Sequence, residues 1–304
     1  MAFAPAGVGN VAVGFDILGH PVEGLGDRVS VRRIEEPVVR IDAITGVVTD
    51  LPVEPEANTA TAGLIRLREE LDLDLGFEVS ICKGIPLGSG LAGSAASAVA
   101  AIVAAEALLE KPLTDQQRYR YALLGEAVAS GSRQADNIAP CLNGGLTLVD
   151  AVGRGVRRIP VPDVIRCAVV FPGLTLETRE ARRVLEEPFP LDVCVRQSAH
   201  LASFLTGCFT GDLELIRASL EDVLVEPRRA ALVPGFARVK QAALDHHALG
   251  CSLSGSGPAV FAWCPDETTA RECACAMAEA FADAGLAANT LVSRVNAPGA
   301  HIIV

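Results

Sequence analysis

The chain has 304 residues, which is enough for two domains with ordinary hydrophobic cores. Half of the residues are apolar and only 4% are aromatic, and the formal net charge of −11 argues against general binding to nucleic acids or anionic membranes. Nine cysteines occur without a C-x-x-C pair, which favours reduced thiols over disulfides or a zinc site.

The N-terminal residues show no basic segment followed by an apolar run, so no signal peptide is visible and we expect a cytoplasmic protein. An uncharged stretch over residues 84–105 raises the question of a membrane span. Pro86 and several glycines break its first half, and the apolar remainder is shorter than the roughly 20 residues that a bilayer needs. We therefore predict a buried helix there and no membrane partner.

In the first half of the chain, hydrophobic periodicity predicts both strands and helices. Apolar and polar residues alternate over 28–33 and over 77–82, as in half-buried strands. Asn58 or Thr59 is a suitable N-cap for a helix over 58–71, and Thr114 or Asp115 for a helix over 114–129. The alanine-rich residues 95–105 predict a further helix, and residues 146–149 a strand.

In the second half, a stretch rich in glycine, proline and arginine over residues 153–162 is the best domain boundary. Beyond it we predict strands over 167–171 and 259–264, and helices over 196–205, 212–224, 235–246 and 268–284. Strands and helices interleave without a regular β-α-β rhythm. The sequence therefore predicts an α+β fold with two domains, residues 1–158 and 159–304.

A glycine- and serine-rich loop over residues 86–96 lies between the predicted strand 77–82 and the predicted helix 95–105. A loop of this kind at a helix N-terminus leaves backbone N–H groups free for an anion, and glycine lets the backbone approach phosphate oxygens closely. No lysine follows it as in G-x-x-x-x-G-K-[ST], and the dinucleotide pattern G-x-G-x-x-G with a later acidic residue is also lacking. The loop predicts a phosphate site, with a plain turn capping a core helix as the alternative.

Four further segments combine polar residues with glycine or proline in ways that a core does not need. They cover residues 5–16, 125–140, 226–229 and 252–258, and they contain Asn10, Asp16, Glu126, Asp136, Asn137 and Arg229.

Taken in order with the loop, these segments closely resemble the GHMP small-molecule kinases and, within them, the homoserine kinase family. The superfamily has an N-x-x-x-G-x-D type segment, a P-x-x-x-G-L-G-S-S-A phosphate loop and a glycine-serine segment ahead of a C-terminal strand. The homoserine kinase pattern adds G-x-D-N-x-A-P, A-R-x-x-L and E-P-x-R, matched here around Asp136, at 181–185 and at 226–229. The resemblance covers essentially the whole chain and implies a ribosomal-S5-like N-terminal domain and a ferredoxin-like α/β sandwich.

The resemblance also implies an activity, namely transfer of the γ-phosphoryl group of ATP to the side-chain hydroxyl of L-homoserine, in threonine biosynthesis, by a homodimer that uses Mg²⁺. It assigns the ATP phosphates to Pro86, Leu87, Gly88, Ser89, Gly90, Leu91, Ala92, Gly93, Ser94, Ala95 and Ala96. It assigns Mg²⁺ to Ser94 and Glu126, whose hard oxygen atoms suit this ion. It assigns the amino acid to Asn10, Asp16, Asn137, Arg182 and Arg229.

The charges of these residues suit a zwitterion, since Asp16 can take its ammonium group and Arg182 and Arg229 its carboxylate. The loop departs from the family, because Ala92 replaces a glycine and Gly93 replaces a serine, which removes one phosphate contact. Ser94 remains for the metal, so we expect ATP binding to survive.

The identity of a general base stays open at this point. A loose transition state needs mainly positioning and charge neutralisation, so a strong base is dispensable. The candidates are Asp136, by resemblance to mevalonate-type relatives, and His200, whose type of side chain titrates near neutrality but more often packs within a helix. Asn137 would orient the hydroxyl.

Two other interpretations of the chain also remain. It could be another GHMP kinase that acts on a small alcohol such as mevalonate, or a kinase-derived sensor that binds without turnover.

Overall fold

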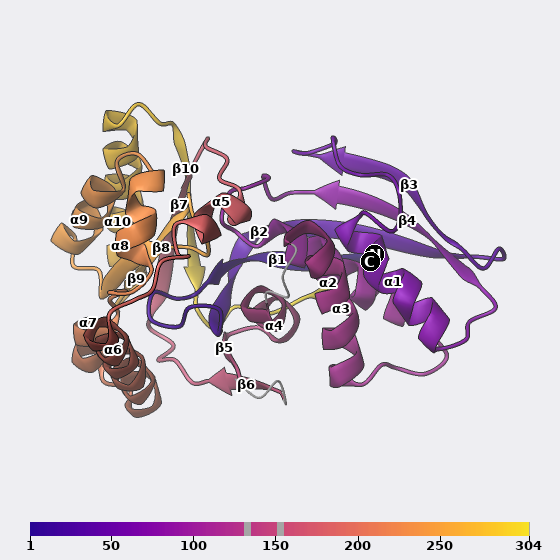
Figure 1. Cartoon of the computed structure of the whole chain (residues 1–304), viewed down its shortest axis with the longest axis horizontal. Coiled ribbons are helices and arrows are strands. Elements are labelled where there is room, and N and C mark those ends of the chain that lie inside the picture. The colour runs from indigo at the N-terminus through magenta and orange to yellow at the C-terminus, as the bar shows by residue number, and fades with distance from the viewer. Residues whose placement is uncertain (131–134, 151–154, 304) are drawn as a thin grey trace.

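The computed structural model describes residues 1–130, 135–150 and 155–303, and it contains two sheets that lie side by side with helices packed on each (Figure 1). Within the described residues the first sheet has seven strands in the order β11-β1-β2-β4-β3, with β5 pairing with β2 and β6 with β5. Among the strand pairs that the structure describes, only β3 and β4 are parallel. These strands are β1 (Ala2–Gly9), β2 (Leu18–Ile34), β3 (Val39–Gly46), β4 (Gly76–Lys83), β5 (Leu146–Val149), β6 (Val156–Ile159) and β11 (His301–Ile302).

The helices described in this half of the molecule are α1 (Thr59–Glu70), α2 (Gly93–Glu106), α3 (Asp115–Ser130) and α4 (Ala135–Asn143). Helix α2 is central, since it contacts β1 and β2 as well as the other three helices. All seven of its alanines are buried, which explains why this segment needs no polar face. The predicted N-cap of α1 is confirmed, because the side chain of Asn58 accepts from the Ala60 N–H at 3.0 Å.

The second sheet is antiparallel in the order β10-β7-β9-β8, and helices α9 and α10 pack on it. Helices α6 and α7 form a hairpin at the other end of this half (Figure 1). The strands are β7 (Arg166–Pro172), β8 (Gly250–Leu253), β9 (Val260–Cys264) and β10 (Ala288–Arg294), and the helices are α5 (Thr178–Arg183), α6 (Leu191–Thr210), α7 (Leu213–Ser219), α8 (Glu226–Arg229), the 3₁₀ turn Ala230–Leu232, α9 (Phe236–Asp245) and α10 (Glu267–Asp283).

The α+β class is confirmed, and several details differ from the sequence-based expectation. The predicted helix 212–224 ends at Ser219, because the carboxylate of Asp222 accepts the next backbone N–H groups, at Leu224, Val225 and Glu226. The chain crosses to the second sheet between β6 and β7, but β11 returns the C-terminus to pair with β1. The last residues, predicted to belong to the second domain, thus pair with the first sheet. No helix in the described ranges is long and apolar enough to span a bilayer.

Candidate active site

A cleft of about 530 Å³ is lined by residues from both halves of the molecule. The loop after β4 and the first turn of α2 form one side, and the segment around α5 forms another. The residues predicted from the sequence that line it are Asn10, Asp16, residues 86–94, Glu126, Asp136, Asn137, Arg182 and Arg229. Segments more than 200 residues apart in the sequence thus line the same cleft, as expected if their motifs form one site.

The glycine-rich loop is shaped by left-handed backbone conformations. Gly88 and Gly90 have φ angles of 59° and 77°, and a Cβ on Gly90 would lie 2.7 Å from the Gly257 carbonyl oxygen. Ala92 also has a positive φ, 57°, and stands at the N-cap of α2 without a side-chain cap. The first N–H groups of a helix have no partner within the helix, so this N-terminus suits an anion.

The structure separates the loop residues into two groups. Residues 86–94 line the cleft, but Ala95 and Ala96 are fully buried within α2 and pack in the core. These two alanines were predicted to contact ATP, and the structure places them in the hydrophobic core.

Ser94 and Glu126 meet at the edge of the cleft. Glu126 projects from α3 and is buried, and the Ser94 hydroxyl donates a hydrogen bond to its carboxylate. Burial, with a smaller contribution from the charge of Asp136, raises the pKa of Glu126 to about 8. A cation at this position would favour the charged carboxylate.

These donors fit a magnesium ion bound together with phosphates. Among the described residues there is no group of three or more acidic, histidine or cysteine side chains that could form a metal cage. Mg²⁺ is commonly held by one or two protein oxygens, substrate phosphates and water, so one carboxylate and one hydroxyl are sufficient.

Asp136 and Asn137 occupy the first turn of α4 and both line the cleft. Asp136 is buried, and this burial, followed by the negative charge of Asp16, raises its pKa to about 7. Its Oδ1 has no hydrogen-bond partner in the described part of the chain. A Cβ on Gly9 would lie 2.8 Å from Asn137 Oδ1, so glycine at this position of β1 leaves space for both side chains.

The loop after β1 is tied to the second half of the molecule through Asn10. Its Nδ2 donates to the Gly255 carbonyl at 2.8 Å, and its Oδ1 accepts from the Asp16 N–H at 3.0 Å. Asn10, Val11 and Ala12 have φ angles of 68°, 45° and 56°, which is strained for a β-branched residue such as Val11. Such strain is typical of functional loops, and Asp16, at the end of this loop, lines the cleft.

Asp16, Arg182 and Arg229 form the charged end of the cleft. Arg182 donates through one guanidinium nitrogen to both oxygens of Asp16, at 2.8 and 3.0 Å. Arg229 is buried and donates to the Ala181 and Gly255 carbonyls, both at 3.0 Å. Its burial, together with the nearby charge of Arg182, lowers its pKa to about 10. The structure thus brings the three predicted charges together and pairs two of them.

The structure does not bring His200 to the cleft. His200 lies in α6, and its Nδ1 is 3.2 Å from the Ser219 carbonyl oxygen of α7. The histidine therefore takes part in packing of the α6–α7 hairpin, and it does not line the cavity. His200, predicted as a possible base, thus lies away from the cleft, and Asp136 is the candidate base that lines it.

Sequence reasoning missed several residues of this site. The segment 175–179 lines the cleft, and the Leu176 N–H donates to the Gly88 carbonyl of the loop at 3.0 Å. Phe15 lies under both arginines, with ring-centroid distances of 5.6 Å to Arg182 and 5.3 Å to Arg229. An isolated aromatic residue and a short polar segment carry no pattern that could have identified them.

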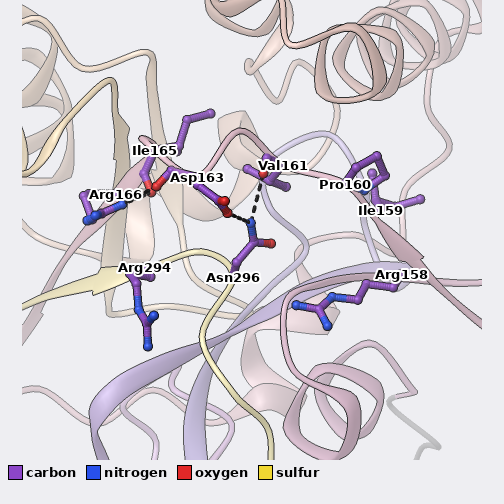
Figure 2. Close-up of a pocket in the computed structure, with 9 residues that line it drawn as sticks. All are labelled: Arg158, Ile159, Pro160, Val161, Asp163, Ile165, Arg166, Arg294 and Asn296. Carbon is purple, nitrogen blue, oxygen red and sulfur yellow. Dashed lines mark hydrogen bonds between the residues drawn. The ribbon is translucent and has the colours of Figure 1, made fainter.

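A larger cavity, of about 790 Å³, lies where the chain crosses between the sheets (Figure 2). Its polar groups are largely engaged within the protein. Arg294 binds Glu23 at 2.6 Å, Arg166 donates to the Asp163 carbonyl at 2.6 Å, and Asn296 donates to the Asp163 carboxylate at 2.9 Å. None of the residues predicted from the sequence lines it, so the smaller cleft is the candidate active site.

Known proteins resemble this chain over almost its whole length. Residues 58–145 match the GHMP kinases N terminal domain, and residues 204–283 match the GHMP kinases C terminal domain. A homoserine kinase of Xanthomonas campestris pv. campestris (strain B100) is 53% identical over 302 residues, which cover 99% of this chain and 93% of the relative. The chain belongs to the GHMP kinase family, in its homoserine kinase branch.

Solved structures show the same relationship. The crystal structure of homoserine kinase from Cytophaga hutchinsonii ATCC 33406 is 40% identical, with a TM-score of 0.96 over 99% of this chain and 96% of that one. L. major mevalonate kinase in complex with R-mevalonate is 16% identical, with a TM-score of 0.71 over 96% of this chain and 95% of that one. The second match shows a shared fold alone, so the alternative of a mevalonate-type kinase gains no support from it.

Proposed function

We propose that this GHMP kinase transfers the γ-phosphoryl group of ATP to the side-chain hydroxyl of L-homoserine, forming O-phospho-L-homoserine and ADP. The observation that carries the proposal is the placement of opposite charges beside an anion-binding loop. Asp16, Arg182 and Arg229 line the same cleft as residues 86–94. A zwitterion that enters between Asp16 and Arg182 can exchange their ion pair for two new ones, with its ammonium on Asp16 and its carboxylate on the arginines.

The phosphate end of the cleft supplies positioning and charge. The N-terminus of α2 and the loop N–H groups bind the phosphates of ATP. Ser94 and Glu126 are the residues that would hold Mg²⁺, and when bound this ion neutralises charge on the transferred group.

The acceptor hydroxyl lies next to Asn137 and Asp136 in this proposal. Asn137 orients the hydroxyl, and the Oδ1 of Asp136 receives its proton late in a loose transition state. A carboxyl group with a pKa raised to about 7 is suited to hold and release a proton near neutral pH. A cytoplasmic homodimer, as the family resemblance implies, is part of the proposal, and sedimentation velocity tests the dimer.

The experiment is a reaction of purified protein with ATP, Mg²⁺ and L-homoserine, followed by phosphorus NMR. The expected result is a new phosphomonoester signal that grows in step with ADP. Release of inorganic phosphate without a phosphomonoester, or nucleotide binding without turnover, would contradict the proposal, and the second result would favour a sensor.

A further inference from the structure

Lys83 is one of only three lysines in a chain with 23 arginines. Lys111 is exposed, whereas Lys83 is buried at the end of β4, directly before the phosphate loop. Its Nζ donates to the Gly93 carbonyl at 2.8 Å and to the Ser97 hydroxyl at 2.9 Å. The third contact of the ammonium group is a buried ion pair with the Asp27 carboxylate of β2.

Asp27 completes a closed set of hydrogen bonds. It is fully buried, and its Oδ1 accepts from the backbone N–H groups of Gly84 and Ile85 at 2.9 and 3.1 Å. Its Oδ2 accepts from the Ser97 hydroxyl at 2.6 Å and from Lys83. The first residues after β4 and the first turns of α2 are therefore fixed to the same carboxylate.

The chemistry of this set explains why lysine stands here. An ammonium group has three donors and no acceptor, and it meets three acceptors, on Asp27, Gly93 and Ser97. The five donors of a planar guanidinium would not be satisfied at this position. A buried ion pair is often no more stabilising than apolar residues of the same volume. Stability of the fold therefore does not explain why Lys83 and Asp27 are present.

We propose that Lys83, Asp27 and Ser97 are positioning residues that hold the phosphate loop and the N-terminus of α2 in their anion-binding arrangement before nucleotide arrives. The three side chains do not line the cleft. They act through residues 84 and 85, directly before the loop, and through residue 93, the first residue of α2. The inference deepens the proposed function, because it rests on nucleotide phosphates binding at this loop.

The test is calorimetric titration of the folded protein with Mg·ADP, which needs neither homoserine nor turnover. Lys83→Met keeps the length of the side chain and removes the ammonium group. We expect the Kd for ADP to rise by at least about tenfold, since several charge-assisted hydrogen bonds that order the loop are lost. We expect KM for ATP to rise in parallel while KM for the amino acid stays nearly unchanged.

Lys240→Met is the matched control. Lys240 forms another largely buried ion pair, with Glu226, and does not line the cleft as the structure describes it. We expect this variant to lose stability but to bind ADP within about twofold of the wild type, because effects at distant sites are independent. If Lys83→Met fails to fold, Ser97→Ala removes only the hydroxyl link and should raise the Kd by about threefold.

A folded Lys83→Met or Ser97→Ala protein that binds ADP as tightly as the wild type would overturn the positioning role. A wild-type protein that binds no ADP would instead overturn the proposed function itself, together with this inference. The two failures are therefore distinguishable in the same titrations.

Discussion

At the scale of single residues, variants of Asn137 and His200 distinguish orientation of the acceptor hydroxyl from general-base catalysis. Asn137 lines the cleft, whereas His200 contacts the Ser219 carbonyl in a helix hairpin. We expect His200→Ala to lower kcat by less than about tenfold, below the range of about 10² to 10⁴ that general-base catalysis contributes. We expect Asn137→Ala to lower kcat by more than about tenfold through lost orientation. Steady-state rates at saturating substrates, with circular dichroism to verify folding, decide between them.

A larger loss of kcat in His200→Ala than in Asn137→Ala, together with loss of the low-pH limb of the pH–rate profile, would identify His200 as the general base. It would also require that α6 move toward the cleft during turnover.

Glu126 tests the proposed metal position. Glu126→Gln keeps the volume of the side chain but removes the charge that a divalent cation requires, so kcat should fall by at least about a hundredfold. Glu279→Gln, on the exposed face of α10, is the matched control and should leave kcat unchanged. Rates measured over a range of Mg²⁺ concentrations check the assignment. If Glu126→Gln turns over as fast as the wild type at limiting Mg²⁺, Glu126 is not a metal ligand.

At the scale of elements, the start of α2 carries strain that glycine would relieve. Ala92 adopts a left-handed conformation, which costs a residue with a Cβ roughly 1 kcal/mol or more. Ala92→Gly should therefore raise the free energy of unfolding by up to about 1 kcal/mol. Ala96→Gly, a buried helical position four residues later, should lower it by at least about 1 kcal/mol. Urea unfolding of both variants measures the contrast, and the same sign for both would refute it.

The elements that could be predicted were those with strong local signals. The alternation of apolar and polar residues predicted part of β4, the run of small apolar residues predicted α2, and Asn58 predicted the start of α1. Strand β1 was missed, because its alanine, glycine and proline residues have low strand propensity and pair only through contacts with β2 and β11.

The same distinction applies to the site. Its glycine-rich loop and charged residues follow from local composition and ordered motifs. Lys83, Asp27 and Phe15 could not be identified, because their roles arise from contacts between segments far apart in the sequence. The position of His200 could not be predicted, because hydrophobic periodicity does not show which neighbouring element each face of a helix contacts.

At the scale of the whole molecule, a buried histidine links the two sheets and makes stability depend on pH. His20 of β2 accepts a hydrogen bond from the Trp263 indole of β9 at 3.2 Å. Burial lowers its pKa from 6.5 to about 4, so between these values the unfolded chain binds a proton that the native protein does not. Stability contributed by neutral His20 is thus present above about pH 6.5 and is lost as the pH falls toward 4, by up to about 3 kcal/mol.

The measurement is the free energy of unfolding in urea between pH 7 and pH 5 for the wild type, His20→Gln and the exposed control His246→Gln. We expect the His20 variant to be less stable at neutral pH and to show a shallower decline. An unchanged pH slope in His20→Gln would show that other groups are responsible.

The central claim is that the cleft recognises a zwitterion with a hydroxyl group, and the most direct test is a comparison of kcat/KM among four acceptors with ATP and Mg²⁺. The acceptors are L-homoserine, γ-hydroxybutyrate, which lacks the ammonium group, the matching amino alcohol, which lacks the carboxylate, and R-mevalonate. Because each missing charge leaves Asp16 or the arginines without their partner, we predict that L-homoserine exceeds every other acceptor by at least about a hundredfold. Equal values for L-homoserine and any of the other three would contradict the account.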